Sequence, residues 1–485
     1  MTRLRALSPL AGDALLYGLS VAFALVTIYT STLALYRQWA ELAIGPFIFG
    51  TICSAVLALV AARRSARTEG RVGAVGPAAT DAPDAPERTA ATATAATATG
   101  TASGMATATA TATTAKRERR HWPARIAIAV CVFAGATAVP LGLEIVWRSD
   151  GAPGSHVQPE VTNIERGGRE VLKGKDLYPE VTNPHGKVVY HAPGVSTVND
   201  FFPYLPFMTV FGLPSEKKHD IALTDARIFF SLATLLVAGT ALYFTKADGR
   251  RKMRALQVIA ILPPAALPLA TGGDDMPVVA FLLLAMVLAQ RRQPFASGVV
   301  LGIVSAMKFT AWPLAALALF AARNRRGDRR PLLMVLGMLV VAGPVVVPFA
   351  LRGPWAFFDN VVLFPLGLSG VSSPAASPLP GHLIVTAFPF LHRALPVAVG
   401  LVGGALLALY LYRRPPRTVA QVCTVGGVVM AVATLFAPAT RIGYLLYPIN
   451  FFVWAYLFAP AGTTEGSPEQ DSLHEADLQL SYSAP

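Results

Sequence analysis

Long apolar segments separated by short basic ones run along most of this chain. The apolar segments fall at about 13–35, 42–62, 124–144, 221–244, 255–271, 276–290, 331–350, 395–412, 419–436 and 444–460. Most approach the roughly 20 residues that a helix needs to cross about 30 Å of hydrocarbon. The first is too long for a signal-peptide core and is followed directly by the second, so we interpret it as a membrane helix. The pattern predicts an all-α polytopic membrane protein with about ten full spans.

The basic residues between these segments predict how the chain crosses the membrane. They all fall on one side if the N-terminus is cytoplasmic, as the positive-inside rule requires; the clusters are Arg3 and Arg5, Arg63 to Arg67, Lys246 to Arg254, Arg291 and Arg292, Arg323 to Arg330, and Arg413 to Arg417. Residues 294–322 have basic clusters at both ends. We therefore expect a hairpin of two short helices that turns near Lys308. A lysine at that depth either extends to the surface or faces a buried anion.

Composition agrees with a membrane protein. Hydrophobic residues make up 53% of the 485 positions and charged residues 14%, which excludes a multidomain soluble protein. The net charge of +13 reflects the basic loops, so we do not interpret it as a nucleic-acid surface. No cysteine or histidine spacing fits a metal site; the pair His185 and His191 is too loosely spaced.

The chain divides into four regions. Residues 1–62 form two N-terminal membrane helices, and residues 63–122 form an Ala/Thr-rich linker that we expect to be disordered and cytoplasmic. Residues 123–461 form the main membrane domain, and 462–485 a disordered cytoplasmic tail. The domain has two long outer loops, 145–220 and 351–394. The second holds Trp355 and its neighbours, which predict an interfacial helix, and then a Pro-rich extended strap.

The first outer loop contains an amphipathic segment. After Pro159, which suits a first helical position, Val161, Ile164, Val171 and Leu172 recur at helical spacing. We expect a surface helix over about 159–173, with Glu160, Asn163, Arg166 and Arg169 on its polar face. The pair Gly167 and Gly168 indicates either close approach of a ligand or another backbone, or a bend.

The order of features in this loop resembles a known family. An acid follows an early membrane helix, then come the amphipathic helix, the segment GKDLYPEV and the aromatic stretch FFPYLPFMTVFGLP. This order is similar to the polyprenol-dependent glycosyltransferases of the GT-C type, most of all glycosyltransferase family 87, a bacterial mannosyltransferase-like group. The resemblance covers about Glu144 to Phe211, and the other spans match by topology only. It implies a multi-pass enzyme of the bacterial plasma membrane that needs no cofactor.

That family implies transfer of a sugar from a polyprenyl phosphate to the hydroxyl of a glycan or glycolipid acceptor on the extracytoplasmic face. Mannose is the sugar that we expect. Transfer would invert the anomeric centre. A carboxylate must take the hydroxyl proton, and fixed cations should stabilise the leaving phosphate. We predict Glu160, or second Glu165, as the catalytic base; Arg441, Lys308 and Arg227 as donor-phosphate ligands; and Asp274, Asp275, Asp225 and Tyr178 as substrate contacts.

Each candidate also has a structural interpretation. Asp274 and Asp275 are placed to cap the helix that follows them, Arg441 to anchor a helix at the interface, and Asp225 and Arg227 to pair with each other. Two other functions remain open. A transporter or flippase would show internal repeats with charges near the midplane, which this sequence lacks. A non-catalytic membrane scaffold would tolerate loss of the outer acids.

Overall fold

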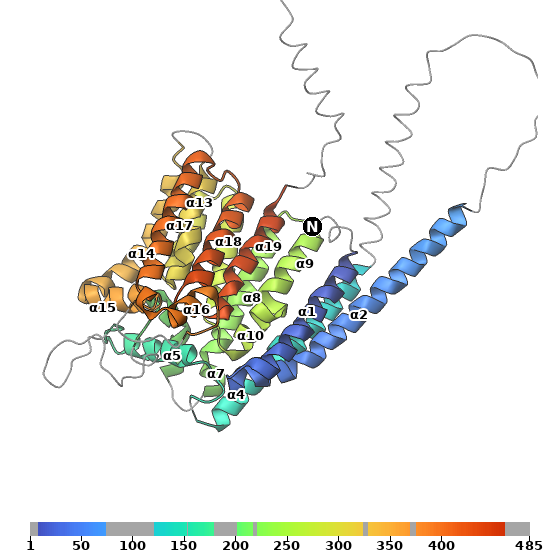
Figure 1. The fold of residues 1–485 in the computed structure, drawn as a ribbon, viewed down its shortest axis with the longest axis horizontal. Helices are drawn as coiled ribbons and strands as arrows, with labels where there is room; N and C mark the ends of the chain where they lie inside the picture. The colour runs from blue at the N-terminus through green and yellow to red at the C-terminus, as the bar shows by residue number, and fades with distance from the viewer. Residues whose placement is uncertain are drawn as a thin grey trace, which may run out of the picture. The chain divides into compact units, whose positions relative to one another are not determined.

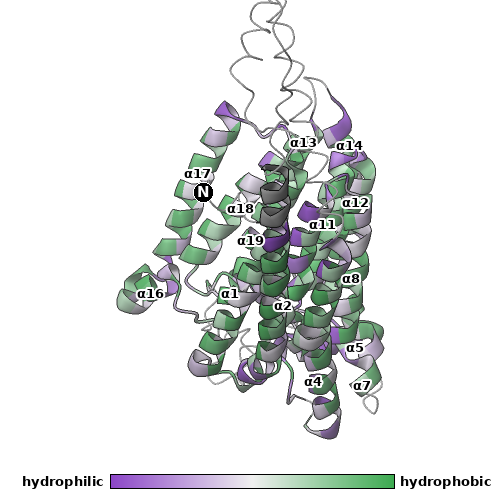
Figure 2. Cartoon of the chain, turned by 90° about the vertical axis from the view of Figure 1, so that its right-hand side faces the viewer, coloured by the Kyte–Doolittle hydropathy of each residue, from purple (hydrophilic) through white to green (hydrophobic). Residues whose placement is uncertain are grey.

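The computed structural model describes residues 8–73, 121–152, 154–178, 201–216, 221–323, 328–368 and 375–460. Over these residues the fold is all-helical, and their sole β-pairing is a bridge between Ala376 and Thr440. Figure 2 shows hydrophobic residues running along the helices. The all-α prediction is confirmed. The predicted linker beyond Gly73, the C-terminal tail beyond residue 460, and His185 and His191 lie outside the described residues.

Eight helical segments in the described parts of the chain are long and apolar enough to cross a membrane. They are Pro9–Thr30, Ala34–Arg64, His121–Asp150, Ala222–Phe244, Gly249–Thr271, Arg330–Arg352, Ala394–Arg413 and Val419–Phe436. The predicted spans at 276–290 and 444–460 fall in shorter apolar helices, Asp275–Gln290 and Ile442–Phe458. The protein is thus a multi-pass membrane protein by length and composition of its helices.

The chain forms two compact units, which we describe separately. The first comprises Met1–Lys173, Thr209–Leu232 and Gln257–Met276. Its elements are α1 (Pro9–Thr30), α2 (Ala34–Gly73), the π-helical turn η2 (Ala134–Ala138), α4 (Val139–Asp150), α5 (Pro159–Leu172), α7 (Ile221–Thr224), the start of α8 (Ala226–Phe244), the π-helical turn η4 (Gln257–Ile261) and α10 (Pro263–Thr271). In Figure 1, α1 and α2 lie side by side as a long helical pair.

A buried polar cluster joins the N-terminal helix pair to the rest of the first unit. Arg125 binds the Asp13 carboxylate through Nε at 2.6 Å and Nη2 at 3.2 Å. Gln257, in the π-helical turn η4, donates to Asp13 at 3.0 Å and to the Tyr17 hydroxyl at 3.3 Å. Charges inside hydrocarbon persist only when they are paired. This cluster therefore fixes how α1 packs against the third and fifth spans.

The π-helical turn η2 packs against α2. A π-turn leaves one backbone carbonyl without its helical donor, and here the Trp39 indole Nε1 donates to the Ala136 carbonyl at 2.9 Å. Gly135 faces Pro46 so closely that a Cβ would overlap the proline ring. The N-terminal pair is thus tightly packed on this span, and the predicted span 124–144 continues as a helix to Asp150. The loop that we predicted on the outer face begins after Asp150, six residues later than predicted.

The second unit comprises Gly174–Met208, Ala233–Leu256 and Pro277–Pro485. Its elements include α9 (Gly249–Leu256), α11 (Asp275–Gln290), α12 (Pro294–Ser305), η5 (Phe309–Ala311), α13 (Trp312–Ala322), α14 (Arg330–Arg352), α15 (Pro354–Phe358), η6 (Asp359–Leu363), α16 (Pro380–Ala387), η7 (Pro389–Leu391), α17 (Ala394–Arg413), α18 (Val419–Phe436), η8 (Ile442–Leu445) and α19 (Leu446–Phe458). A 3₁₀ helix, η3 (Pro206–Glu216), begins in this unit.

The segment predicted as a hairpin forms two short helices that are interrupted at Lys308. Gly298 and Gly302 of α12 meet the backbone at Met334 and Met338 of α14, so α12 and α14 run in the same direction. The chain must therefore reverse between them, through the interruption and α13. Lys308 has an extended backbone there, with φ −153° and ψ 137°.

Candidate active site

Helix α5 lies on the first unit as the amphipathic pattern predicted, over Pro159–Leu172. Its N-terminus is fixed to the end of α10, where the Gln158 backbone N–H donates to the Thr271 carbonyl at 3.1 Å. The Gln158 side chain also donates to the Thr271 hydroxyl at 2.6 Å. Gly272, with φ +114°, lies so close to Val161 that a Cβ would overlap it. Glycine alone suits this turn.

The glycine pair in α5 marks a close approach of two backbones. A Cβ on Gly168 would overlap the backbone of Gly212, and one on Gly212 would overlap the carbonyl of Ile164. The Ser215 hydroxyl adds a hydrogen bond to the Glu165 carbonyl at 3.2 Å. Of the two alternatives left open by the sequence, close backbone contact is confirmed. This contact presses α5 onto the unit and buries Glu165.

A closed network of two arginines and two acids lies beneath α5. Arg148 binds both oxygens of Glu165, at 2.9 and 2.7 Å, and reaches Asp225 at 2.7 Å. Arg227 grips Asp225 with Nε at 3.0 Å and Nη2 at 2.9 Å. All four residues are at most 6% exposed. Two positive and two negative charges balance, as burial in a low-dielectric interior demands.

This network gives several predicted site residues a structural task. Asp225 and Arg227 pair with each other, which confirms that alternative. Arg227 also donates to the carbonyls of His156 and Ala270, so its guanidinium is fully engaged by the protein. Glu165 accepts a further bond from the Ala226 N–H at 3.2 Å. Its lone pairs are directed at Arg148 and the start of α8, a geometry that favours positioning over proton transfer.

Other predicted site residues also lie in the first unit. Glu160 lies in the first turn of α5 and is half-buried. Asp274 and Asp275 are buried after the Gly272 turn, and Asp275 is the first residue of α11. Asn163 was expected on the polar face of α5. It is buried instead and accepts a hydrogen bond from Arg166 at 2.6 Å.

A carboxylate–imidazole pair lies next to this network. Glu144, in α4, is fully buried, and its Oε2 lies 3.0 Å from Nδ1 of His156. Its other oxygen, Oε1, accepts no hydrogen bond from the residues that the structure describes. The His156 side chain is 30% exposed. A carboxylate only accepts hydrogen bonds, so with Glu144 ionised Nδ1 carries the proton and Nε2 of a neutral imidazole keeps its lone pair.

The backbone of His156 is held in an unfavourable conformation. Its φ of +54° lies in the left-handed region, which costs a non-glycine residue on the order of 1–3 kcal/mol. The bond from Arg227 Nη1 to the His156 carbonyl, at 2.8 Å, holds the residue there. The Trp147 ring packs against the imidazole with centroids 5.5 Å apart. The charge network thus fixes the orientation of the exposed imidazole.

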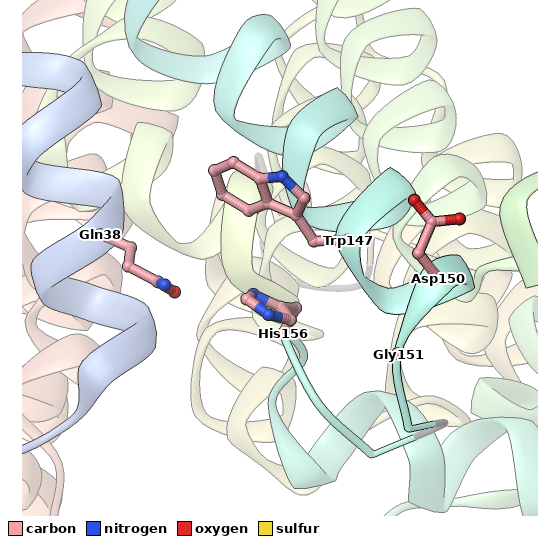
Figure 3. Close-up of a pocket in the computed structure, with 5 residues that line it drawn as sticks. All are labelled: Gln38, Trp147, Asp150, Gly151 and His156. Carbon is pink, nitrogen blue, oxygen red and sulfur yellow. The ribbon is translucent and has the colours of Figure 1, made fainter.

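A cavity of about 310 Å³ opens at this imidazole. It is lined by Gln38, Trp147, Asp150, Gly151 and His156. Figure 3 shows Gln38 of α2, Trp147 of α4 and His156 turned toward one shared space. The structure therefore places an imidazole, paired with a buried acid, at an open cavity of the first unit.

The second unit contains a buried cation. Lys308 is 6% exposed, and its Nζ lies 5.5 Å from the ring centroid of Tyr204 and 5.6 Å from that of Tyr444. Aromatic faces attract an ammonium group. The interruption of the helix is stabilised by backbone bonds from Leu205 N–H to the Met307 carbonyl and from Phe207 N–H to the Ala306 carbonyl. The lysine is held in place by aromatic rings.

Tyr178 packs in an aromatic cluster of the second unit. Its hydroxyl donates to the Tyr204 carbonyl at 2.8 Å, and the rings of Phe202 and Phe357 lie 6.0 and 5.0 Å away. The side chain is 1% exposed, and burial raises the pKa of its hydroxyl well above the ordinary value, with a further contribution from Asp176. We predicted a substrate contact here. The geometry favours a packing role that supports the Tyr204 ring beside Lys308.

Arg441 lies at the start of η8 in the second unit. The residue before it, Thr440, exchanges backbone hydrogen bonds with Ala375 and Ser377, so the predicted Pro-rich strap runs beside this segment. Arg441 is half-exposed. A side chain near the surface of the unit is compatible with both predicted roles of Arg441, as a donor-phosphate ligand and as an anchor at the interface.

The family comparison bears on both units. Residues 202–438 match the model of glycosyltransferase family 87. This protein is a glycosyltransferase. The match agrees with the resemblance found in the sequence and covers just under half of the chain, including Asp225, Arg227 and Lys308. No curated protein matches the chain.

Two residues of this glycosyltransferase escaped the sequence analysis. Glu144 ended a predicted span, and His156 was not among the predicted site residues. The signal for Glu144 was present, because an acid inside an apolar run is rare unless it has a partner and a function. His156 carried no local signal, since its link to Glu144 depends on how the loop after α4 turns back. Both lie outside the matched segment.

Proposed function

We propose that this glycosyltransferase moves a hexose from a polyprenyl phosphate to an acceptor hydroxyl on the extracytoplasmic face of a bacterial plasma membrane. The hexose that we expect is mannose. The observation that carries the proposal is the His156–Glu144 pair at an open cavity. A lipid-linked donor suits a site built at the end of membrane helices. The family match and the multi-pass helical architecture support the same class of reaction.

In the proposed reaction the acceptor oxygen attacks the anomeric carbon of the donor sugar as the bond from that carbon to the phosphate oxygen breaks. The hydroxyl proton passes to Nε2 of His156, and Glu144 stabilises the imidazolium that forms. The leaving group is the polyprenyl phosphate. A single displacement inverts the anomeric centre. His156 thereby replaces Glu160 as our leading base, and Glu165 is set aside because Arg148 binds both of its oxygens.

Glu160 becomes the second candidate for the base. It lies in the first turn of α5, two residues after Gln158. The donor-phosphate ligands Lys308 and Arg441 stay predictions from the sequence. Negative charge grows on the phosphate as its bond to the sugar breaks, and a fixed cation stabilises that charge most in the transition state. Arg227 no longer serves this role in the proposal, because Asp225 and backbone carbonyls engage its guanidinium.

The test is sugar transfer by the purified chain in lipid vesicles, with a membrane extract as acceptor. Labelled polyprenyl-phosphate mannose is compared with labelled nucleotide mannose. We expect product from the lipid donor alone, and a fall of about 10²–10⁴ in rate for His156→Gln. His392→Gln, an exposed histidine in the second unit, is the matched control. Transfer from the nucleotide donor alone, or a His156→Gln variant as fast as the control, would refute the proposal.

A further inference from the structure

The cavity beside His156 has the lining of a sugar-binding site. Trp147 presents an indole that is 36% exposed, and Gln38, Asp150 and His156 offer hydrogen-bonding groups around the same space. An aromatic ring packs against the apolar C–H face of a pyranose, while planar amide and carboxylate groups bind its hydroxyls. Figure 3 shows Gln38 of α2, Trp147 of α4 and His156 of the loop after α4 around one space, with Asp150 at its edge and its carboxylate directed away.

The charge of the lining selects against a phosphate. Among the lining residues that the structure describes, Asp150 is a carboxylate and none is a lysine or an arginine. The acid Glu144 lies directly behind His156. A phosphate anion placed here would meet negative charge, whereas a neutral polyhydroxyl ligand meets suitable donors and acceptors. The volume of about 310 Å³ lies at the lower limit of ligand pockets, which suits one sugar ring better than a polyprenyl chain.

Gln38 comes from the N-terminal helix pair. Gln38 belongs to α2, which with α1 forms a helix pair outside the segment that matches the family model. The pair is fixed to the rest of the unit by the Asp13–Arg125 ion pair and by the bond from Trp39, the neighbour of Gln38, to the Ala136 carbonyl. These contacts hold Gln38 in a defined place opposite Trp147.

We propose that Gln38, Trp147 and Asp150 form the acceptor subsite, which takes a neutral hexopyranoside and directs one of its hydroxyls at His156. The inference rests on the proposed function for the identity of the reaction, but its binding test does not. The N-terminal helix pair then contributes directly to the choice of acceptor. The Trp147 ring packs against the face of the sugar ring, and Gln38 and Asp150 select the pattern of its hydroxyls.

The experiment measures binding without turnover. The full chain in lipid nanodiscs is titrated with the methyl pyranosides of mannose, glucose and galactose, and with inorganic phosphate, by saturation-transfer NMR. We expect saturable binding of at least one hexoside, no saturable binding of phosphate, and about tenfold weaker hexoside binding in Trp147→Ala. Gln38→Ala should weaken it severalfold. The controls are Trp355→Ala, an exposed tryptophan of α15, and Gln293→Ala, an exposed glutamine before α12.

The outcomes separate this inference from the proposed function. Hexoside binding that depends on Trp147 and Gln38, in a chain that transfers nothing, would support the subsite and refute the reaction. If the wild-type chain transfers sugar but the Trp147→Ala and Gln38→Ala variants bind every hexoside as tightly as wild type does, the subsite is overturned. Binding of phosphate in preference to all three hexosides would also overturn it. Trp147→Phe, which keeps an aromatic face, keeps the test valid if the alanine variant misfolds.

Discussion

The role of Glu165 is the point at which the structure and the sequence differ most, and Glu165→Gln tests it. The substitution keeps the shape of the side chain but removes one of two negative charges from the network with Arg148 and Arg227. Removing one partner of a buried ion pair costs about 3–5 kcal/mol. Because the amide keeps one acceptor oxygen for Arg148, we take the lower limit, about 3 kcal/mol. At about 2–4 °C per kcal/mol, the unfolding midpoint should fall by roughly 6–12 °C.

The assay is thermal unfolding of the purified chain in detergent. The fraction of protein that stays monodisperse is measured as the temperature rises. Glu170→Gln, on the same helix and half-exposed, is the matched control and should shift the midpoint little. Transfer activity is measured on both variants at a temperature where they remain folded. A Glu165→Gln variant as stable as the control but inactive would show that Glu165 acts in the chemistry, and our interpretation of the network would be wrong.

Three further substitutions test other parts of the account. Lys308→Met should lower turnover by about 10²–10³ through loss of phosphate stabilisation, measured as transfer rate at saturating donor; an unchanged rate would remove Lys308 from the site. Tyr178→Phe should lower the free energy of unfolding by about 1–3 kcal/mol, because the Tyr204 carbonyl loses a donor, while the KM for either substrate stays constant. Gly168→Ala should reduce the yield of monodisperse protein, because α5 must move away from its backbone contact. Gly142→Ala, which meets open space, should not.

The periodic features of the sequence predicted their structures well. Helix α5 lies where the spacing of Val161 and Ile164 placed it, and Gly168 marks a close backbone contact. The interruption at Lys308 also lies inside the segment whose charges required a turn. Each of these depends on a local pattern, since hydrophobic period, helix propensity and basic loops act within a few residues of chain.

The active-site geometry depends on contacts that no local pattern contains. Arg148 was overlooked because the helix was expected to end at residue 144, so its reach to Asp225, 77 residues away, had no signal. His156 has a left-handed backbone, and Arg227, 71 residues further along the chain, binds its carbonyl. The choice between Glu165 and the His156–Glu144 pair rests on which carboxylate the arginines neutralise. That distinction is a property of tertiary packing.

The most direct test of the central claim is a double-mutant cycle on the His156–Glu144 pair, with the rate of the chemical step from polyprenyl-phosphate mannose as the readout. If the two residues act as one unit, His156→Gln and Glu144→Gln each slow transfer strongly, and the double variant is hardly slower than His156→Gln alone. Independent effects that multiply in the double variant, or a Glu144→Gln variant that transfers at the wild-type rate, would contradict the account.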